Sequence, residues 1–113
     1  MYISTHPVQR VKQEQQIQSI TADIIRHMTG GQYIKMVGMI AAIKQIRTKK
    51  GELMGFIEME DETGSISVTI FPKEYIKVIE WIKEDQMLFI EGIVEVRKGF
   101  PQIILKKCTA ISS

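Results

Sequence analysis

The stretch GFIEMEDETGSISVTI, residues 55–70, alternates apolar and polar side chains on both sides of a turn sequence. Successive side chains of a β-strand point to opposite faces, so the alternation predicts two half-buried antiparallel strands. Between them, DETG ends in Gly64, and glycine suits a tight turn that needs one left-handed residue. We predict that the inward side chains are Ile57, Met59, Ile66, Val68 and Ile70.

Three further segments carry the same strand signals, namely β-branched and apolar residues bounded by turn sequences. TKKGE places Gly51 in a hairpin tip before the stretch described above, and KGF joins the last two segments. The five predicted strands are residues 33–47, 53–60, 65–71, 87–97 and 101–111.

Two helices are predicted, one before the first strand and one between the third and fourth strands. Pro72 can open the second helix because proline at the first helical position needs no hydrogen-bond donor. Gly30 and Gly31 end the first helix, since glycine tolerates the positive φ of a helix end. The apolar stripes are Ile17, Ile20, Ile24 and Met28 in the first helix and Tyr75, Ile79 and Ile82 in the second.

Five short strands with one helix between the third and fourth form the element order of an OB-fold, a five-stranded, partly open barrel that binds oligonucleotides across its second and third strands. The predicted class is therefore mainly β, with an N-terminal helical segment before the barrel. We place a linker and helix in residues 1–32 and the OB-fold domain in residues 33–113. The same order also fits another small barrel or an α+β sheet.

Composition excludes several classes of function. Cys108 is the only cysteine, so there is no internal disulfide and no CxxC motif. The longest apolar run, VGMIAAI, is far too short to span a bilayer, and we expect a cytoplasmic protein with no membrane partner. The formal net charge of +2 permits nucleic-acid binding, but only clustering of the charges would argue for it.

The outward face of the central hairpin carries an aromatic residue among small hydroxyls. Phe56 could stack on a base, because every base offers a π-face, and Ser67 lies on the same predicted surface. The alternative is that Phe56 packs under the N-terminal helix.

Two basic loops are predicted to flank this face, as the corresponding loops of an OB-fold do. RTKK precedes the second strand, and RKGF joins the fourth and fifth. Solvated hairpin tips also attract lysines, but the paired placement favours contacts to phosphate, with Phe100 as a second stacking surface. The candidate nucleic-acid-binding residues are Arg47, Lys49, Lys50, Phe56, Ser67, Arg97, Lys98 and Phe100.

No catalytic, metal or cofactor site is predicted. Glu58 and Glu60 lie at outward strand positions without a desolvated pocket to shift their pKa values. His6 and His27 have no cysteine or acid at ligand spacing, and the phosphate-binding glycine motifs are missing. Glu58 would repel phosphate from the proposed face, so it either contacts a base edge or weakens binding.

The sequence resembles the C-terminal OB-fold region of the alpha subunit of bacterial DNA polymerase III, the DnaE-type replicative polymerase. YISTHP resembles the Y-[LI]-S-G-H-P element that precedes this domain, with Thr5 where glycine is usual. The string RTKKGE…MEDETG…FP resembles the OB signature itself. The shorter pattern F-x-x-[LM]-x-D-x-x-G is shared with anticodon-binding OB domains of class II aminoacyl-tRNA synthetases and is carried by Phe56, Met59, Asp61 and Gly64.

The resemblance implies a module that holds single-stranded DNA template near the polymerase, within a protein several times longer. It also implies that the magnesium-binding acids of the polymerase lie upstream, and that the module has no active site of its own. Its partners would be single-stranded DNA, other domains of the parent protein and replisome subunits. Two alternatives stay open: an RNA binder of the anticodon type, and an OB domain that docks another protein.

Overall fold

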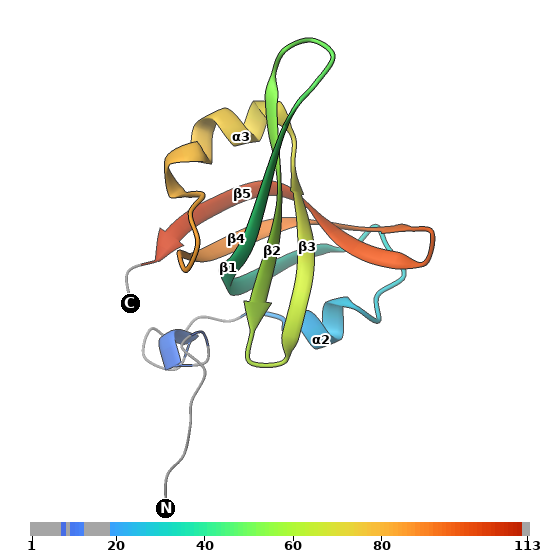
Figure 1. The fold of residues 1–113 in the computed structure, drawn as a ribbon. Helices are drawn as coiled ribbons and strands as arrows, with labels where there is room; N and C mark the ends of the chain where they lie inside the picture. The colour runs from blue at the N-terminus through green and yellow to red at the C-terminus, as the bar shows by residue number, and fades with distance from the viewer. Residues whose placement is uncertain (1–7, 9, 13–18, 112–113) are drawn as a thin grey trace, which may run out of the picture.

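The computed structural model describes residue 8, residues 10–12 and residues 19–111, and five of its elements are strands that close into one barrel (Figure 1). The strands follow the order β1-β2-β3-β5-β4 around the barrel. This confirms a mainly β, five-stranded OB-fold with a helix between β3 and β4. In chain order the elements are α2 (Ala22–Ile25), β1 (Tyr33–Arg47), β2 (Leu53–Asp61), β3 (Gly64–Ile70), α3 (Pro72–Val78), a 3₁₀ turn (Ile79–Trp81), β4 (Met87–Arg97) and β5 (Phe100–Ile111).

Closure of the barrel depends on β1, which takes part in two pairings. Its first half pairs with β4 and its second half with β2, both antiparallel, and a bulge between Ile40 and Ala42 separates the halves. A bulge bends a strand and increases its twist, which lets one strand turn the corner of a small barrel. The last gap is closed by a short parallel pairing of β3 with β5, in which Ser67 lies opposite Gln102.

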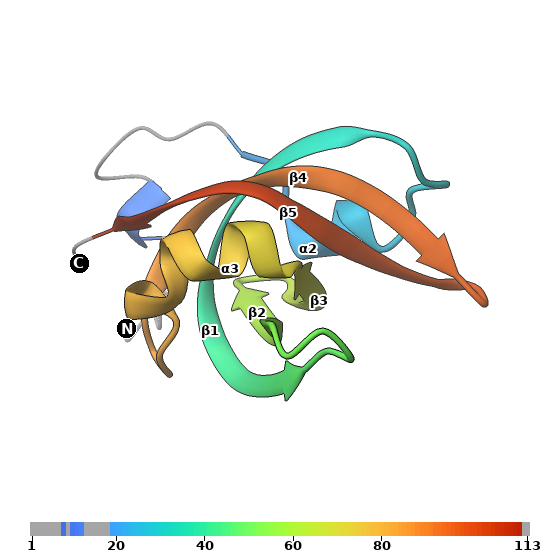
Figure 2. The same cartoon turned by 90° about the horizontal axis from the view of Figure 1, so that it is seen from above.

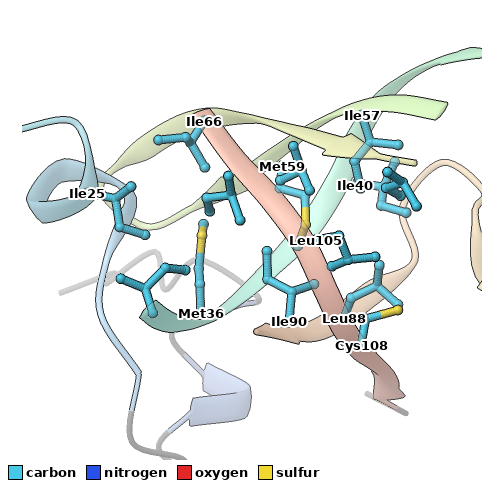
Figure 3. Close-up of a cluster of buried hydrophobic side chains, with 14 of the residues drawn as sticks. Ile25, Met36, Ile40, Ile57, Met59, Ile66, Leu88, Ile90, Leu105 and Cys108 are labelled. Carbon is cyan, nitrogen blue, oxygen red and sulfur yellow. The ribbon is translucent and has the colours of Figure 1, made fainter. Parts of the chain in front are cut away.

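The core fills the inside of the barrel, and the predicted inward side chains lie in it (Figure 3). Each of the five predicted residues of β2 and β3 is at most 3% exposed, so the alternation assigned the two faces correctly. Side chains of the other strands meet them, chiefly Met36, Ile40, Leu88, Ile90 and Leu105.

Helix α3 covers one end of the barrel, and its buried face differs from the predicted stripe (Figure 2). Tyr75 and Val78 are buried, whereas Ile79 is 41% exposed, so the predicted place of Ile79 in the stripe is wrong. The α-helix ends at Val78 and continues as the 3₁₀ turn, whose tighter winding changes which residues face the barrel. The Tyr75 hydroxyl donates a 2.7 Å hydrogen bond to Gln45 Oε1.

Helix α2 is much shorter than predicted. It has four residues, and its buried isoleucine is Ile25, while Ile24 is 50% exposed. Ile20 and Met28 pack against the core as predicted, but the predicted place of Ile24 in the stripe is wrong. Contacts to β1 and to the β2–β3 turn, rather than helical periodicity, set the orientation of this segment. The backbone N–H of Ile20 donates to the Lys35 carbonyl at 2.9 Å. Ile17 and the YISTHP element lie outside the described residues.

A second apolar cluster attaches the helical residues 8 and 10–12 to the barrel. Val8 and Val11 pack there against Val37 and Met87. Ala22 and Ile25 belong to the main core, so side chains from both sides of residue 32 pack together. The domain boundary at residue 32 stays a prediction. Among the described residues, no helix is long and apolar enough to cross a membrane.

Candidate nucleic-acid interface

A groove of about 340 Å³ lies on the outer surface of the barrel, across β1, β2, β3 and β5. The strand register explains its composition, because Ala42, Glu58, Ser67 and Gln102 lie side by side in one row across the four strands. Lys44 lies opposite Phe56 in the adjacent row of β1 and β2. The side chains that give the groove its chemistry are Lys44, Phe56, Glu58, Ser67 and Gln102.

Phe56 supplies the aromatic surface of this groove. Its side chain is 37% exposed, and it does not belong to either of the two buried clusters of the described residues. Helix α2 instead contacts β3, through the turn that joins β2 to β3. A base can therefore reach the ring from the outside of the barrel.

Two hydrogen bonds fix the polar groups of the groove. Ser67 Oγ donates to Glu58 Oε2 at 3.0 Å. Thr69, which is buried, donates through Oγ1 to Gln102 Oε1 at 2.8 Å, which leaves the amide NH₂ of Gln102 as a donor. The groove thus offers one aromatic face, hydrogen-bond donors from Lys44 and Gln102, and one carboxylate.

The β1–β2 hairpin rises above the barrel, and three of the predicted cationic residues lie at its end (Figure 1). Lys49 and Lys50 are exposed in its turn. Arg47 lies on the opposite face of β1 from Lys44, because their separation is odd, and its Nη1 donates to the Gly51 carbonyl at 2.8 Å. The end of this hairpin therefore presents two exposed lysine side chains and one arginine that is hydrogen-bonded to its own turn.

The β4–β5 hairpin projects from the side of the barrel and ends in a two-residue turn (Figure 1). Lys98 has φ 53° and Gly99 has φ 80°, as a type I′ turn requires. Arg97 pairs with Glu95 at 3.0 Å, which offsets part of its charge. Phe100 is 76% exposed and lies on the same face of β5 as Gln102, nearer the hairpin tip and outside the lining of the groove.

The structure brings Phe56 and Ser67 together and leaves the other predicted residues at the two hairpin ends, outside the lining of the groove. The sequence interpretation missed Lys44 and Gln102. Alternation along β1 could have indicated Lys44, although the bulge near Ala41 interrupts it. Gln102 joins the groove only through the parallel pairing of β5 with β3, for which the sequence contains no local signal.

Asp61 and Gly64 of the short family pattern have a structural role beside the groove. Asp61 is 3% exposed, and its Oδ2 accepts a hydrogen bond from the Ala22 backbone N–H at 2.8 Å. Its Oδ1 accepts from the backbone N–H and the hydroxyl of Thr63, at 2.8 and 2.7 Å. The guanidinium of Arg26 lies over Gly64, where a Cβ would meet it at 3.0 Å. These contacts attach α2 to the β2–β3 turn.

The remaining reactive groups of the described residues do not form a chemical centre. No group of three or more His, Cys, Asp or Glu residues in this part of the chain could hold a metal ion. Burial raises the pKa of Cys108 to about 11, so its thiol stays protonated near neutral pH. Trp81 packs partly against the core and borders a cavity of about 260 Å³ between α3 and β5.

The barrel, the groove and the sequence define a nucleic-acid-binding class of domain. Residues 34–111 match a family model described as "OB-fold nucleic acid binding domain", and the chain belongs to this family. Its relatives are DNA polymerase III alpha subunits. The chain is 45% identical over 65 residues to the subunit of Halalkalibacterium halodurans, and 27% identical over 107 residues to that of Bacillus subtilis.

These matches cover 57% and 95% of this chain but only 6% and 10% of the two relatives, so the chain spans about a tenth of their length or less. The resemblance to the polymerase alpha subunit that the sequence predicted is confirmed. The matched family is described by nucleic-acid binding.

Two solved structures show the same fold at low sequence identity. Asparaginyl-tRNA synthetase from Pyrococcus horikoshii has a TM-score of 0.68 and 16% identity, over 86% of this chain and 23% of the synthetase. The mitochondrial single-stranded DNA binding protein Rim1 of S. cerevisiae has a TM-score of 0.57 and 11% identity, over 72% of this chain and 96% of Rim1.

Proposed function

We propose that the domain binds single-stranded DNA template as a module of a replicative DNA polymerase III alpha subunit in the bacterial cytoplasm. One observation carries the proposal: an exposed aromatic ring, Phe56, lies in a groove with hydrogen-bond donors on the strands that OB-folds use for oligonucleotides. The polymerase relatives and the fold shared with Rim1 support it. The proposed function requires no cofactor.

The candidate site combines two kinds of contact. Bases would stack on Phe56 and Phe100. The cationic residues at the ends of the two hairpins would attract the phosphates, namely Arg47, Lys49, Lys50, Arg97 and Lys98. Lys44 and Ser67 would add polar contacts inside the groove. Such a site favours an unpaired strand, because a base within a duplex cannot present its face to an aromatic ring.

The test is fluorescence anisotropy of a labelled single-stranded DNA titrated with the domain at two salt concentrations, beside a duplex of the same sequence and an RNA hairpin. We expect the single strand to bind best and its affinity to fall as salt rises. Preference for the RNA hairpin would indicate the anticodon-type function, which the fold shared with asparaginyl-tRNA synthetase favours.

Protein docking is the second candidate function, and one observation favours it. Ile76 on α3 is 76% exposed, and Ile79 beside it is 41% exposed, which is unusual for large apolar side chains on so short a helix. Another domain of the parent protein or a replisome subunit could cover them. If the domain binds none of the three nucleic acids at low salt, the DNA-binding proposal is wrong and protein docking becomes the favoured function.

A further inference from the structure

The carboxylate of Glu58 lies on the floor of the groove, where a polyanion is proposed to bind. Among the described residues Glu58 forms no ion pair, and its partner is the hydroxyl of Ser67. A carboxylate that faces only phosphates would weaken binding. It becomes favourable if it accepts hydrogen bonds from the edge of a base, an inference that rests on the proposed function.

Strand geometry places Glu58 at the edge of a base stacked on Phe56. The two residues lie two positions apart on the same face of β2, which separates them by roughly 7 Å along the strand. A base that lies flat on the ring extends over a comparable distance, so its hydrogen-bonding edge can meet the carboxylate. Lys44, directly opposite Phe56, lies along another side of the same base.

A carboxylate accepts hydrogen bonds and donates none, so it selects bases by their donors. Guanine has two adjacent donors, N1–H and the 2-amino group, which match the two oxygens of a carboxylate. Adenine, cytosine and thymine each present a single donor group on that edge. The 6-oxo group of guanine, next to N1–H, can in turn accept from Lys44 or from the Gln102 amide.

We infer that Glu58 makes this groove selective for guanine in single-stranded DNA, through a bidentate contact between its carboxylate and the Watson–Crick edge of the base stacked on Phe56. Glu58 is then the specificity-determining residue of the site. Ser67 acts as a positioning residue, because its hydroxyl holds one carboxylate oxygen and both oxygens retain free lone pairs.

The test uses five dodecamers, one of thymine alone and four that alternate thymine with guanine, hypoxanthine, adenine or cytosine. The alternation avoids runs of guanine. Hypoxanthine is guanine without the 2-amino group, so it removes one of the two proposed hydrogen bonds. We expect guanine to bind about tenfold more tightly than thymine, since a good bidentate pair discriminates by roughly 5- to 150-fold. Hypoxanthine should lose most of this advantage.

Glu58→Gln keeps the size of the side chain and an acceptor for Ser67 but lacks the second acceptor oxygen. In this variant the guanine and hypoxanthine oligonucleotides should bind equally. The matched control is Glu60→Gln, which removes the same charge from the next outward position of β2, outside the groove lining, and should keep the guanine preference. Thermal unfolding of both variants checks that they fold.

The outcomes separate the inference from the function on which it rests. Equal binding of all five oligonucleotides would overturn guanine selectivity and leave single-strand binding intact. A guanine preference that persists in Glu58→Gln would overturn the assignment to this residue. No binding to any oligonucleotide would overturn the proposed function itself, and the inference with it.

Discussion

Asp61 shows how one buried carboxylate joins two parts of the chain that are distant in sequence. Its three hydrogen bonds, of 2.7 to 2.8 Å, satisfy the Ala22 backbone N–H at the start of α2 and both donors of Thr63. Removing the side chain leaves the buried Ala22 N–H without an acceptor, and a buried donor without a partner is costly. The Thr63 donors, on an exposed residue, lose the bonds that hold the turn but can reach water.

We therefore expect Asp61→Ala to lower the free energy of unfolding by about 3 kcal/mol, as judged from the cost of lost hydrogen bonds to a charged group. Urea denaturation measures the change. The control is Glu84→Ala, an exposed loop position, which should stay within about 0.5 kcal/mol of wild type. An equal, small effect of both substitutions would show that Asp61 does not hold α2.

Because of Cys108, we expect the free energy of unfolding of the domain to fall at alkaline pH. Its pKa is raised by burial from 9.0 to about 11 in the folded protein. Below pH 9 the thiol is protonated in both the folded and the unfolded state. Between pH 9 and 11 only the unfolded state loses the proton, so the free energy of unfolding falls as pH rises.

Cys108→Ala should show a smaller fall over this window in urea titrations at pH 8, 9, 10 and 11. Identical slopes for the two proteins would contradict the burial of the thiol.

Phe56 and Lys49 should contribute to DNA binding in distinguishable ways. Lys49→Ala removes a phosphate contact, so it should weaken binding and reduce the slope of log K against log salt by about 0.7. Phe56→Ala removes a stacking surface and should weaken binding by roughly 1–3 kcal/mol without changing that slope. Lys83→Ala, outside the groove and both hairpin tips, is the matched control. If both test variants bind DNA as tightly as the wild-type protein, the groove is not the DNA-binding site.

At the scale of elements, the close approach of β4 to β5 depends on Gly92. A Cβ at this position would collide with the carbonyl oxygen of Ile104 and with the Ile103 side chain, next to the bulge of this pair. We expect Gly92→Ala to cost about 3 kcal/mol of stability, because a backbone oxygen cannot move aside.

Gly38→Ala provides the comparison for this prediction. Its Cβ would meet the terminal methyl of Met59 at 2.7 Å, and a flexible side-chain end can rotate away. Thermal unfolding should therefore show a larger loss for Gly92→Ala than for Gly38→Ala. The reverse order would mean that β4 and β5 are further apart than the structure shows.

The elements with local signals were predictable from the sequence, and those set by distant contacts were not. The β2–β3 hairpin follows from its own alternation and from Gly64, and all five inward side chains were assigned correctly. In each helical segment one predicted apolar residue was wrong, Ile24 in the first and Ile79 in the second. The reason is that Asp61 orients α2 across 39 residues and that the 3₁₀ turn changes the winding after Val78. Gln102 was not predicted for the same reason, because only the parallel pairing of β5 with β3 places it next to Ser67.

At the scale of the whole molecule, the residues before the barrel contribute to its core. Ala22 and Ile25 are fully buried, and burial of an isoleucine alone typically contributes several kcal/mol. A chain of residues 33–113 would expose the core surface that these side chains cover. We expect it to be less stable than the full chain by about 4 kcal/mol in urea denaturation.

The matched comparison is a chain of residues 19–113, which retains α2 and the Asp61 contacts and should recover most of this loss. If residues 33–113 instead unfold at the same urea concentration as the full chain, the residues before 33 add nothing to the stability of the barrel, and residue 32 is a true domain boundary.

The attachment of α2 to the β2–β3 turn also determines how a force would travel through the protein. Asp61 belongs to the strand that carries Glu58 and Phe56, three and five positions further back. Tension on the chain before Ala22 is therefore shared between the Ile20–Lys35 hydrogen bond to β1 and the Asp61 hydrogen bond to β2. Anything that pulls on or turns the preceding segment would reorient the groove with it.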